Sequence, residues 1–119
     1  MSAAYWRHRA EIAELLDPRL YNIEWLDEGV ITGAVRTFGN DTAVIVTETK
    51  QYPAGAKEAH GLVAAGELTS ILKLIEEAEA WGRDQGCDFA SISSREGWVR
   101  VLAIKGYEPH QLTIRKELR

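Results

Sequence analysis

Cysteine is nearly absent from this sequence, whose 119 residues include only Cys87. No disulfide can form within the chain, and a lone cysteine beside a turn is typical of a small, partly buried apolar side chain. The sequence also lacks any run that approaches ~18 apolar residues, and its opening stretch "MSAAYWRHRAEIAELL" lacks the apolar segment of a signal peptide. These absences predict a cytoplasmic protein that is neither secreted nor membrane-spanning.

An excess of basic residues is missing as well. The net charge is −4 and the isoelectric point is near 5.4. Because phosphate contacts need clustered Lys and Arg, this composition argues against a nucleic-acid binder. The pairing of His60 with Cys87 or Glu48 follows no recognised metal-ligand spacing, so we also expect no metal.

What the sequence does have is the composition of an ordinary globular protein. Apolar residues make up 45% of the chain and charged residues 27%. The length suffices for one domain and not for two, so we expect a single domain over residues 1–119.

Two helices are predicted in the first third of the chain. Residues 3–16 place apolar side chains at helical spacing, and Asp17-Pro18 ends the pattern because proline disfavours helical geometry in the residue before it. A second helix is predicted from Asn22, which can cap it, to Gly33, which can end it. A hairpin that turns at "DEG", residues 27–29, is the alternative.

Strands and helices then alternate. Strands are predicted at 34–38, 42–52, 57–65, 88–93 and 111–118, and helices at 67–85 and 95–105. Ser93 and Glu96 have the spacing of a capping box for the last helix. In the last strand, Leu112, Ile114 and Leu118 alternate with polar residues. The order ααβββαβαβ predicts an α/β fold with a mixed sheet of about five strands and helices on both faces.

Two stretches carry a resemblance to a known family. "AEAWGRDQGCD", residues 78–88, leads into a strand, and "GWVRVLAIKGYEP", residues 97–109, leads into the last one. This arrangement resembles the GNAT acetyltransferase superfamily over roughly residues 20–118, and most closely the short GNAT-like proteins of phages and prophages. The resemblance implies a compact GNAT-like domain, located in the cytoplasm of a host cell or in a phage particle.

The resemblance also indicates where a cofactor would bind. GNAT enzymes hold the acyl-CoA pyrophosphate with an R/Q-x-x-G-x-G/A loop at the start of the long helix, where free backbone amides point at the anion. That loop falls on Gly66, Glu67, Leu68, Thr69, Ser70 and Ile71. Thr69 and Ile71 stand where the family has glycines, and Glu67 adds a negative charge. Leu102 stands where many family members have a tyrosine that protonates the leaving thiolate.

These departures predict a domain that is degenerate at the acyl-CoA site and acts as a non-catalytic binding or structural module. The alternative is an active N-acetyltransferase with an atypical pyrophosphate loop, and only then is acetyl-CoA its cofactor. A third reading is a binder of another small ligand in the same cleft. If the chain is active, Glu48 and His60 are the candidate bases, although a solvated Glu48 and a half-buried structural His60 are the alternatives.

The tryptophans divide into two groups. Trp81 and Trp98 lie among apolar residues at helical spacing and are expected in the core. Trp6 and Trp25 lie near the N-terminus, and if exposed they mark a surface for a protein partner or for self-association.

Overall fold

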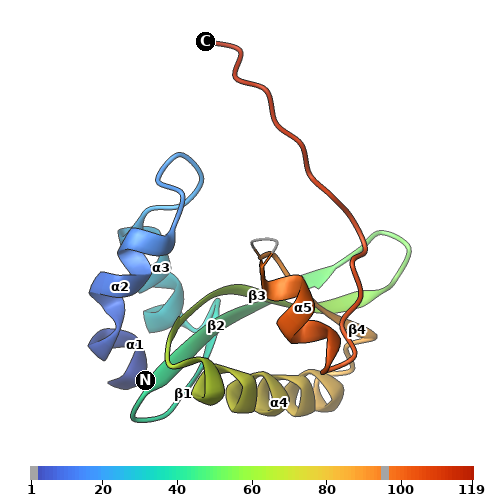
Figure 1. Cartoon of the computed structure of the whole chain (residues 1–119), viewed down its shortest axis with the longest axis horizontal. Helices are drawn as coiled ribbons and strands as arrows, with labels where there is room; N and C mark the ends of the chain where they lie inside the picture. The colour runs from blue at the N-terminus through green and yellow to red at the C-terminus, as the bar shows by residue number, and fades with distance from the viewer. Residues whose placement is uncertain (1–2, 95–96) are drawn as a thin grey trace.

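The computed structural model describes residues 3–94 and 97–119 (Figure 1). Along this part of the chain the elements are α1 (Ala3–Arg7), α2 (Arg9–Leu15), α3 (Ile23–Thr32), β1 (Arg36–Gly39), β2 (Ala43–Gln51), β3 (Lys57–Gly66), α4 (Leu68–Asp84), β4 (Phe89–Ile92) and α5 (Gly97–Ala103). No helix in the described ranges is both long and apolar enough to cross a bilayer.

The strands form one mixed sheet in the order β1-β2-β3-β4. β1 pairs with β2 and β2 with β3 in antiparallel fashion, while β3 pairs with β4 in parallel. α4 provides the crossover that a parallel pair requires. The predicted mixed α/β sheet is therefore confirmed.

The prediction of a fifth strand at 111–118 is wrong. The chain runs away from the sheet over these residues (Figure 1), and none of them is assigned to a strand. Leu112, Ile114 and Leu118 are 86%, 85% and 88% exposed. Alternating polarity specifies which side chains share a face of a strand, but it does not supply the neighbouring edge that the backbone needs.

The first predicted helix is divided at His8 into α1 and α2, although backbone hydrogen bonds continue across it from His8 to Ala4 and from Ile12 to His8. The second has the ends that the sequence predicts. The Asn22 side chain accepts from the Trp25 amide at 2.8 Å, and Gly33 takes the left-handed conformation with φ +83°. The hairpin alternative is therefore wrong.

Two apolar clusters draw on alternate residues of β2. Val44 and Val46 pack with residues of the three N-terminal helices, including Tyr5, Ile12 and Leu26. On the other side of the strand, Ala43 and Ile45 pack with α4 and α5.

α4 packs one face into the second apolar cluster. Ile71, Leu74 and Ile75 are buried, whereas Leu72 is only half-buried. Trp81 and Trp98 are also half-buried, and Trp98 packs against the α4 cluster. The capping box of α5 includes Glu96, which lies outside the described residues.

Truncation of Leu74 tests this packing. Leu74 is 1% exposed, so Leu74→Ala removes buried methyl groups and is expected to lower the free energy of unfolding by about 2–5 kcal/mol. Leu68→Ala on the same helix is the control, because Leu68 is 48% exposed. Denaturant melting of both variants measures the difference, and equal losses would show that the helix face is assigned wrongly.

Candidate functional site

The candidate site begins where the neighbouring strands β3 and β4 separate. β4 pairs with β3 only from Glu58 to Gly61, although β3 continues to Gly66. The register between β2 and β3 shifts at the same place, because Val46 pairs with Val63 and Thr47 with Gly61, leaving Leu62 as a bulge. Bulges bend a strand and commonly border functional sites. Beyond Gly61, β3 therefore has a β2 neighbour but no β4 neighbour.

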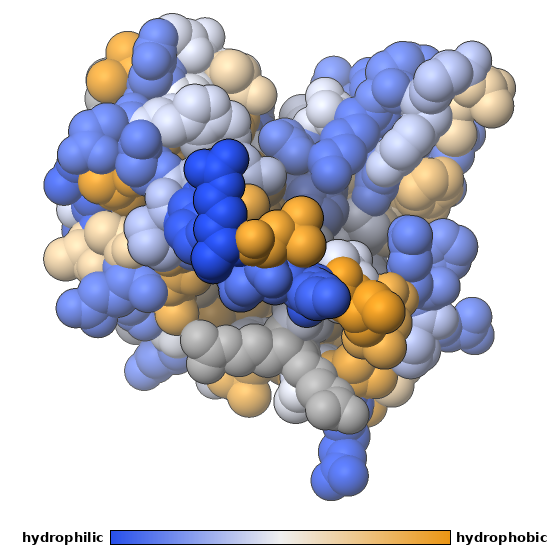
Figure 2. All heavy atoms as spheres, turned by 90° about the horizontal axis from the view of Figure 1, so that it is seen from above, coloured by the Kyte–Doolittle hydropathy of each residue, from blue (hydrophilic) through white to orange (hydrophobic). Residues whose placement is uncertain are grey.

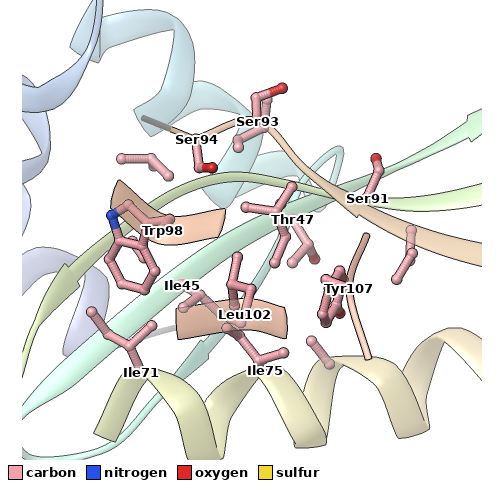
Figure 3. A pocket seen from close by; sticks show the side chains of 18 of the residues that line it. Ile45, Thr47, Ile71, Ile75, Ser91, Ser93, Ser94, Trp98, Leu102 and Tyr107 are labelled. Carbon is pink, nitrogen blue, oxygen red and sulfur yellow. The ribbon is translucent and has the colours of Figure 1, made fainter. Parts of the chain in front are cut away.

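A cleft of about 280 Å³ lies where β3 and β4 separate. Its lining is largely apolar and comes from α2, β2, β3, α4 and the β4–α5 segment. Figure 3 shows Ile45, Leu102, Ile71 and Ile75 between the sheet and α4, with Trp98 beside them and the hydroxyls of Ser91 and Ser93 pointing away from α4.

A buried polar network lies next to this cleft. Glu58 and His60 are 5% and 8% exposed, and both come from β3. The hydroxyls of Ser91 and Tyr52 both donate to the Glu58 carboxylate. Ser91 Oγ also lies 2.7 Å from His60 Nδ1, and Ser93 Oγ lies 3.3 Å from His60 Nε2.

These contacts define the tautomer of His60. The single hydroxyl proton of Ser91 is directed to Glu58, so Ser91 Oγ accepts a hydrogen bond from His60. Nδ1 therefore carries the proton and donates it, whereas Nε2 keeps its lone pair. Nε2 is directed toward Ser93, which lines the cleft. The arrangement presents a neutral base one hydroxyl away from the cleft.

The surroundings keep His60 neutral. Burial lowers the pKa of His60 below its ordinary value of 6.5, and the Lys50 ammonium lowers it further. The carboxylates of Glu58 and Glu48 act in the opposite direction but do not outweigh burial.

This depressed pKa predicts how stability depends on pH. Below pH ~6.5 the unfolded chain protonates His60 before the folded chain does, so the free energy of unfolding falls as the pH falls. We expect His60→Gln to lose less stability than the wild type between pH 7 and pH 5. His110→Gln, at an exposed position, is the matched control. Urea melts at the two pH values provide the measurement, and parallel losses in all three proteins would contradict the assignment.

Glu48, the other candidate base from the sequence, stands opposite His60 in the register of β2 and β3. Its carboxylate lies 3.7 Å from the Lys50 ammonium, and its side chain is 23% exposed. The structure thus places the two candidates on adjacent strands, and only His60 contacts the serine hydroxyls that line the cleft.

Sequence analysis missed Glu58, Tyr52 and the role of Ser91. Glu58 and His60 are two residues apart and share a face of β3, a signal that the sequence does contain. Ser91 comes from a strand some thirty residues later and is the β4 partner of His60. Only the register of the parallel pair brings it there.

The segment 66–71 lies at the other end of β3. A Cβ on Gly66, which has φ +111°, would lie 2.2 Å from the Thr42 carbonyl oxygen. This glycine is therefore required by its contact with β2 whether or not a ligand binds. The Glu67 amide donates to the same carbonyl at 3.1 Å, and the Ser70 and Thr42 hydroxyls share a hydrogen bond.

The start of α4 nevertheless fits an anion. Glu67 is the N-cap residue, and its side chain does not cap the helix. Leu68 and Thr69 are exposed, while the Ile71 side chain is buried in the core and lines the cleft. The Ile71 side chain thus does not cover the first-turn amides. The negative charge of Glu67 remains beside them.

Leu102 and Tyr107 border the cleft on the α5 side. Leu102 is 4% exposed and packs in the α4 cluster. The Tyr107 hydroxyl donates to Glu79 at 2.7 Å, and burial together with this bond raises the pKa of Tyr107 far above its ordinary value of 10.0. Neither side chain is placed to give up a proton at neutral pH.

Two other predictions concern surfaces and metals. Trp6 and Trp25 are 38% and 44% exposed, and Trp25 stacks with the exposed Tyr21 at a ring-centroid distance of 5.0 Å. Within residues 3–94 and 97–119, no group of three His, Cys, Asp or Glu residues could hold a metal ion.

Known structures share the fold of this chain. An acetyltransferase from Trypanosoma brucei has a TM-score of 0.71 at 13% identity, with 98% of this chain and 94% of that chain covered. A GCN5-related N-acetyltransferase from Ralstonia eutropha has a TM-score of 0.67 at 18% identity, covering 96% and 86%. A predicted acetyltransferase from Clostridium acetobutylicum, solved with acetyl-CoA, has a TM-score of 0.62 at 8% identity, covering 81% and 72%.

No family model and no curated protein matches the sequence. The structural neighbours are acetyltransferases of the GNAT superfamily, and the chain has their fold. At identities below 20%, these TM-scores establish the fold alone. The activity of this chain has to be argued from the residues of the site.

Proposed function

We propose that this chain binds an acyl-CoA in the cleft between β3 and β4 and transfers the acyl group to an amine. One observation carries the proposal. The cleft lies beside the polar network of His60 on one side and is lined on the other by Ile71, in the first turn of α4, where backbone amides that have no partner within the helix can bind an anion.

The residues present fit such a ligand in most respects. The first-turn amides of Leu68, Thr69 and Ser70 would hold the diphosphate. The edge of β3 beyond Gly61 has no β4 neighbour, so its backbone groups can pair with the amides of the pantetheine chain. Glu67 opposes the diphosphate, so we expect weak binding.

The bound acyl-CoA supplies an activated thioester. The protein supplies the proton acceptor: an amine in the cleft loses its proton through Ser93 to His60 Nε2, while Ser91 and Glu58 hold the ring in the tautomer that can accept it. Because Leu102 cannot donate a proton, the thiolate must leave as an anion or be protonated by water. A thiol has an ordinary pKa of about 8.5, so this route is feasible but slow.

A non-catalytic module is the second candidate. The buried Leu102 and the charge of Glu67 favour it, since both remove functions that a working acyltransferase uses. In that case the domain binds a protein partner through its exposed aromatic residues, in a host cell or in a phage particle, and the cleft is empty or holds another small ligand.

Turnover separates the two candidates. The assay follows release of free CoA thiol from acetyl-CoA in the presence of a panel of primary amines. Amine-dependent release supports the acyltransferase. No release with any amine, whether or not acetyl-CoA binds, supports the non-catalytic module.

A further inference from the structure

The Ser93 hydroxyl lies where the chain leaves the sheet after β4. The last pair between β3 and β4 joins Gly61 to Ile92, so Ser93 is the first residue beyond that pairing. Ser93 is exposed and lines the cleft. Its hydroxyl points away from α4 (Figure 3), and Figure 2, which views the molecule from the side opposite α4, shows a recess between two lobes that is open to solvent. A small substrate can therefore reach this hydroxyl.

The surroundings of Ser93 differ from those of an ordinary surface serine. His60 Nε2 lies 3.3 Å from Ser93 Oγ and directs its lone pair at the hydroxyl. The other ring nitrogen donates to Ser91 Oγ at 2.7 Å, and Ser91 donates to the Glu58 carboxylate. A hydroxyl, an oriented imidazole and a carboxylate in series activate a serine nucleophile. Here one further hydroxyl stands between the imidazole and the carboxylate.

Glu58 can stabilise the cation that forms when His60 accepts a proton. A carboxylate oxygen of Glu58 lies 3.8 Å from His60 Nδ1, and the two side chains are 7% and 10% exposed. Little water screens charges at such a position, so the attraction is stronger than at the surface. Of the three serines in residues 91–94, Ser91 and Ser93 contact the His60 ring.

The cleft around Ser93 suits an acyl group. Its lining is largely apolar and includes Leu15, Leu62 and Trp98. An apolar acyl chain can leave water there, while its carbonyl carbon stays at the polar edge that the serines form.

We propose that Ser93 is a nucleophile that takes the acyl group from a thioester or an activated ester in the cleft, and that the chain hydrolyses such substrates when no amine is present. The proposal shares the cleft and the His60 base with the acyltransferase proposed above. It requires neither an amine nor the diphosphate site at the start of α4.

The first step forms an acyl-serine. Ser93 Oγ attacks the carbonyl carbon while its proton passes to His60 Nε2. The bond from the carbonyl carbon to the leaving sulfur or oxygen then breaks, and the leaving group takes the proton from the imidazolium. His60 thus supplies the proton that Leu102 cannot donate.

The second step restores the serine. A water molecule attacks the ester carbonyl and gives its proton to His60 Nε2. The bond between the carbonyl carbon and Ser93 Oγ breaks, and Oγ recovers the proton from the imidazolium. The products are a carboxylic acid and the thiol or alcohol released in the first step, and water is the only co-reactant.

A fluorophosphonate probe tests the nucleophile, because such probes react irreversibly with activated serines. One probe group per chain is expected, and peptide mapping by mass spectrometry should place it on Ser93. Ser93→Ala should remain unlabelled. Thr49→Val, which removes a hydroxyl from an exposed position of β2, is the matched control and should be labelled like the wild type.

Hydrolysis of p-nitrophenyl acetate in an amine-free buffer tests the activity without CoA. Ser93→Ala should lose at least about 10²-fold in rate, within the loss that follows removal of a serine nucleophile. His60→Gln should lose about 10²–10⁴-fold, the contribution of a general base. Release of thiol from acetyl-CoA in the same buffer tests the thioester. If only the p-nitrophenyl ester is hydrolysed, the serine is active on esters and the acyl-CoA proposal fails separately.

Three results would overturn the proposal. The first is a probe group on Ser94 or on a lysine in place of Ser93. The second is equal hydrolysis of p-nitrophenyl acetate by the wild type and by folded Ser93→Ala, with folding checked by urea melting. The third is no hydrolysis of either substrate above the rate in buffer.

Discussion

Replacing His60 with glutamine is expected to lower turnover by about 10²–10⁴-fold, the usual contribution of a general base. Glutamine can keep a hydrogen bond to Ser93 but cannot accept a proton from the amine. His60 itself is absent from the cleft lining, so the affinity for acetyl-CoA should change little. The expected signature is a loss in kcat without a matching change in the dissociation constant.

The control for this variant is Glu48→Gln. Glu48 lies opposite His60 but pairs with Lys50, so its removal should cost less than about tenfold in kcat. Urea melting must show that His60→Gln is folded. Equal losses from the two variants, or a larger loss from Glu48→Gln, would move the role of base to Glu48.

Reversing the charge at residue 67 is expected to strengthen acetyl-CoA binding. Glu67 precedes the first-turn amides of α4, where the diphosphate would lie, so Glu67→Lys converts a repulsion into an attraction. A change of at least about tenfold in the dissociation constant corresponds to ~1.4 kcal/mol, a modest value for two opposite charges near a surface. The gain should shrink in high salt.

Glu77→Lys is the matched control, because it makes the same charge change at an exposed position of the same helix. Ten residues of helix separate the two positions by about 15 Å. If both variants strengthen binding equally, the effect is one of overall charge. If Glu67→Lys has no effect, the diphosphate does not lie at the start of α4.

The parts of the fold that local chemistry determines could be predicted from sequence. Asn22 and Gly33 bound α3 because a side-chain oxygen and a left-handed glycine act within one turn of the chain. The two long strands were predicted from their residue types and from the turn residues that flank them. The last strand could not be predicted correctly, since its pattern at Leu112 and Ile114 describes a strand whose neighbour the same domain does not supply.

The candidate site was predicted only in part. His60 could be singled out as a titratable residue on a strand. Which of its ring nitrogens accepts a proton depends on Ser91 and Glu58, and the register of β3 and β4 brings these two residues to it. Gly66 shows the opposite problem. The position of Gly66 suggested contact with a phosphate. The structure shows that a glycine is required there because the Thr42 carbonyl oxygen lies too close for any Cβ.

The central claim is that the cleft binds an acyl-CoA, and calorimetric titration with acetyl-CoA tests it most directly. Ser94 lines the cleft and is exposed, so Ser94→Trp should block the cleft without disturbing the core (Figure 3). Glu77→Trp, on the exposed side of α4, is the control. We expect a dissociation constant below about 1 mM for the wild type and the control, within the usual range for enzyme substrates, and binding at least about tenfold weaker for Ser94→Trp. No saturable heat with the wild type, or equal affinity in all three proteins, would contradict the account.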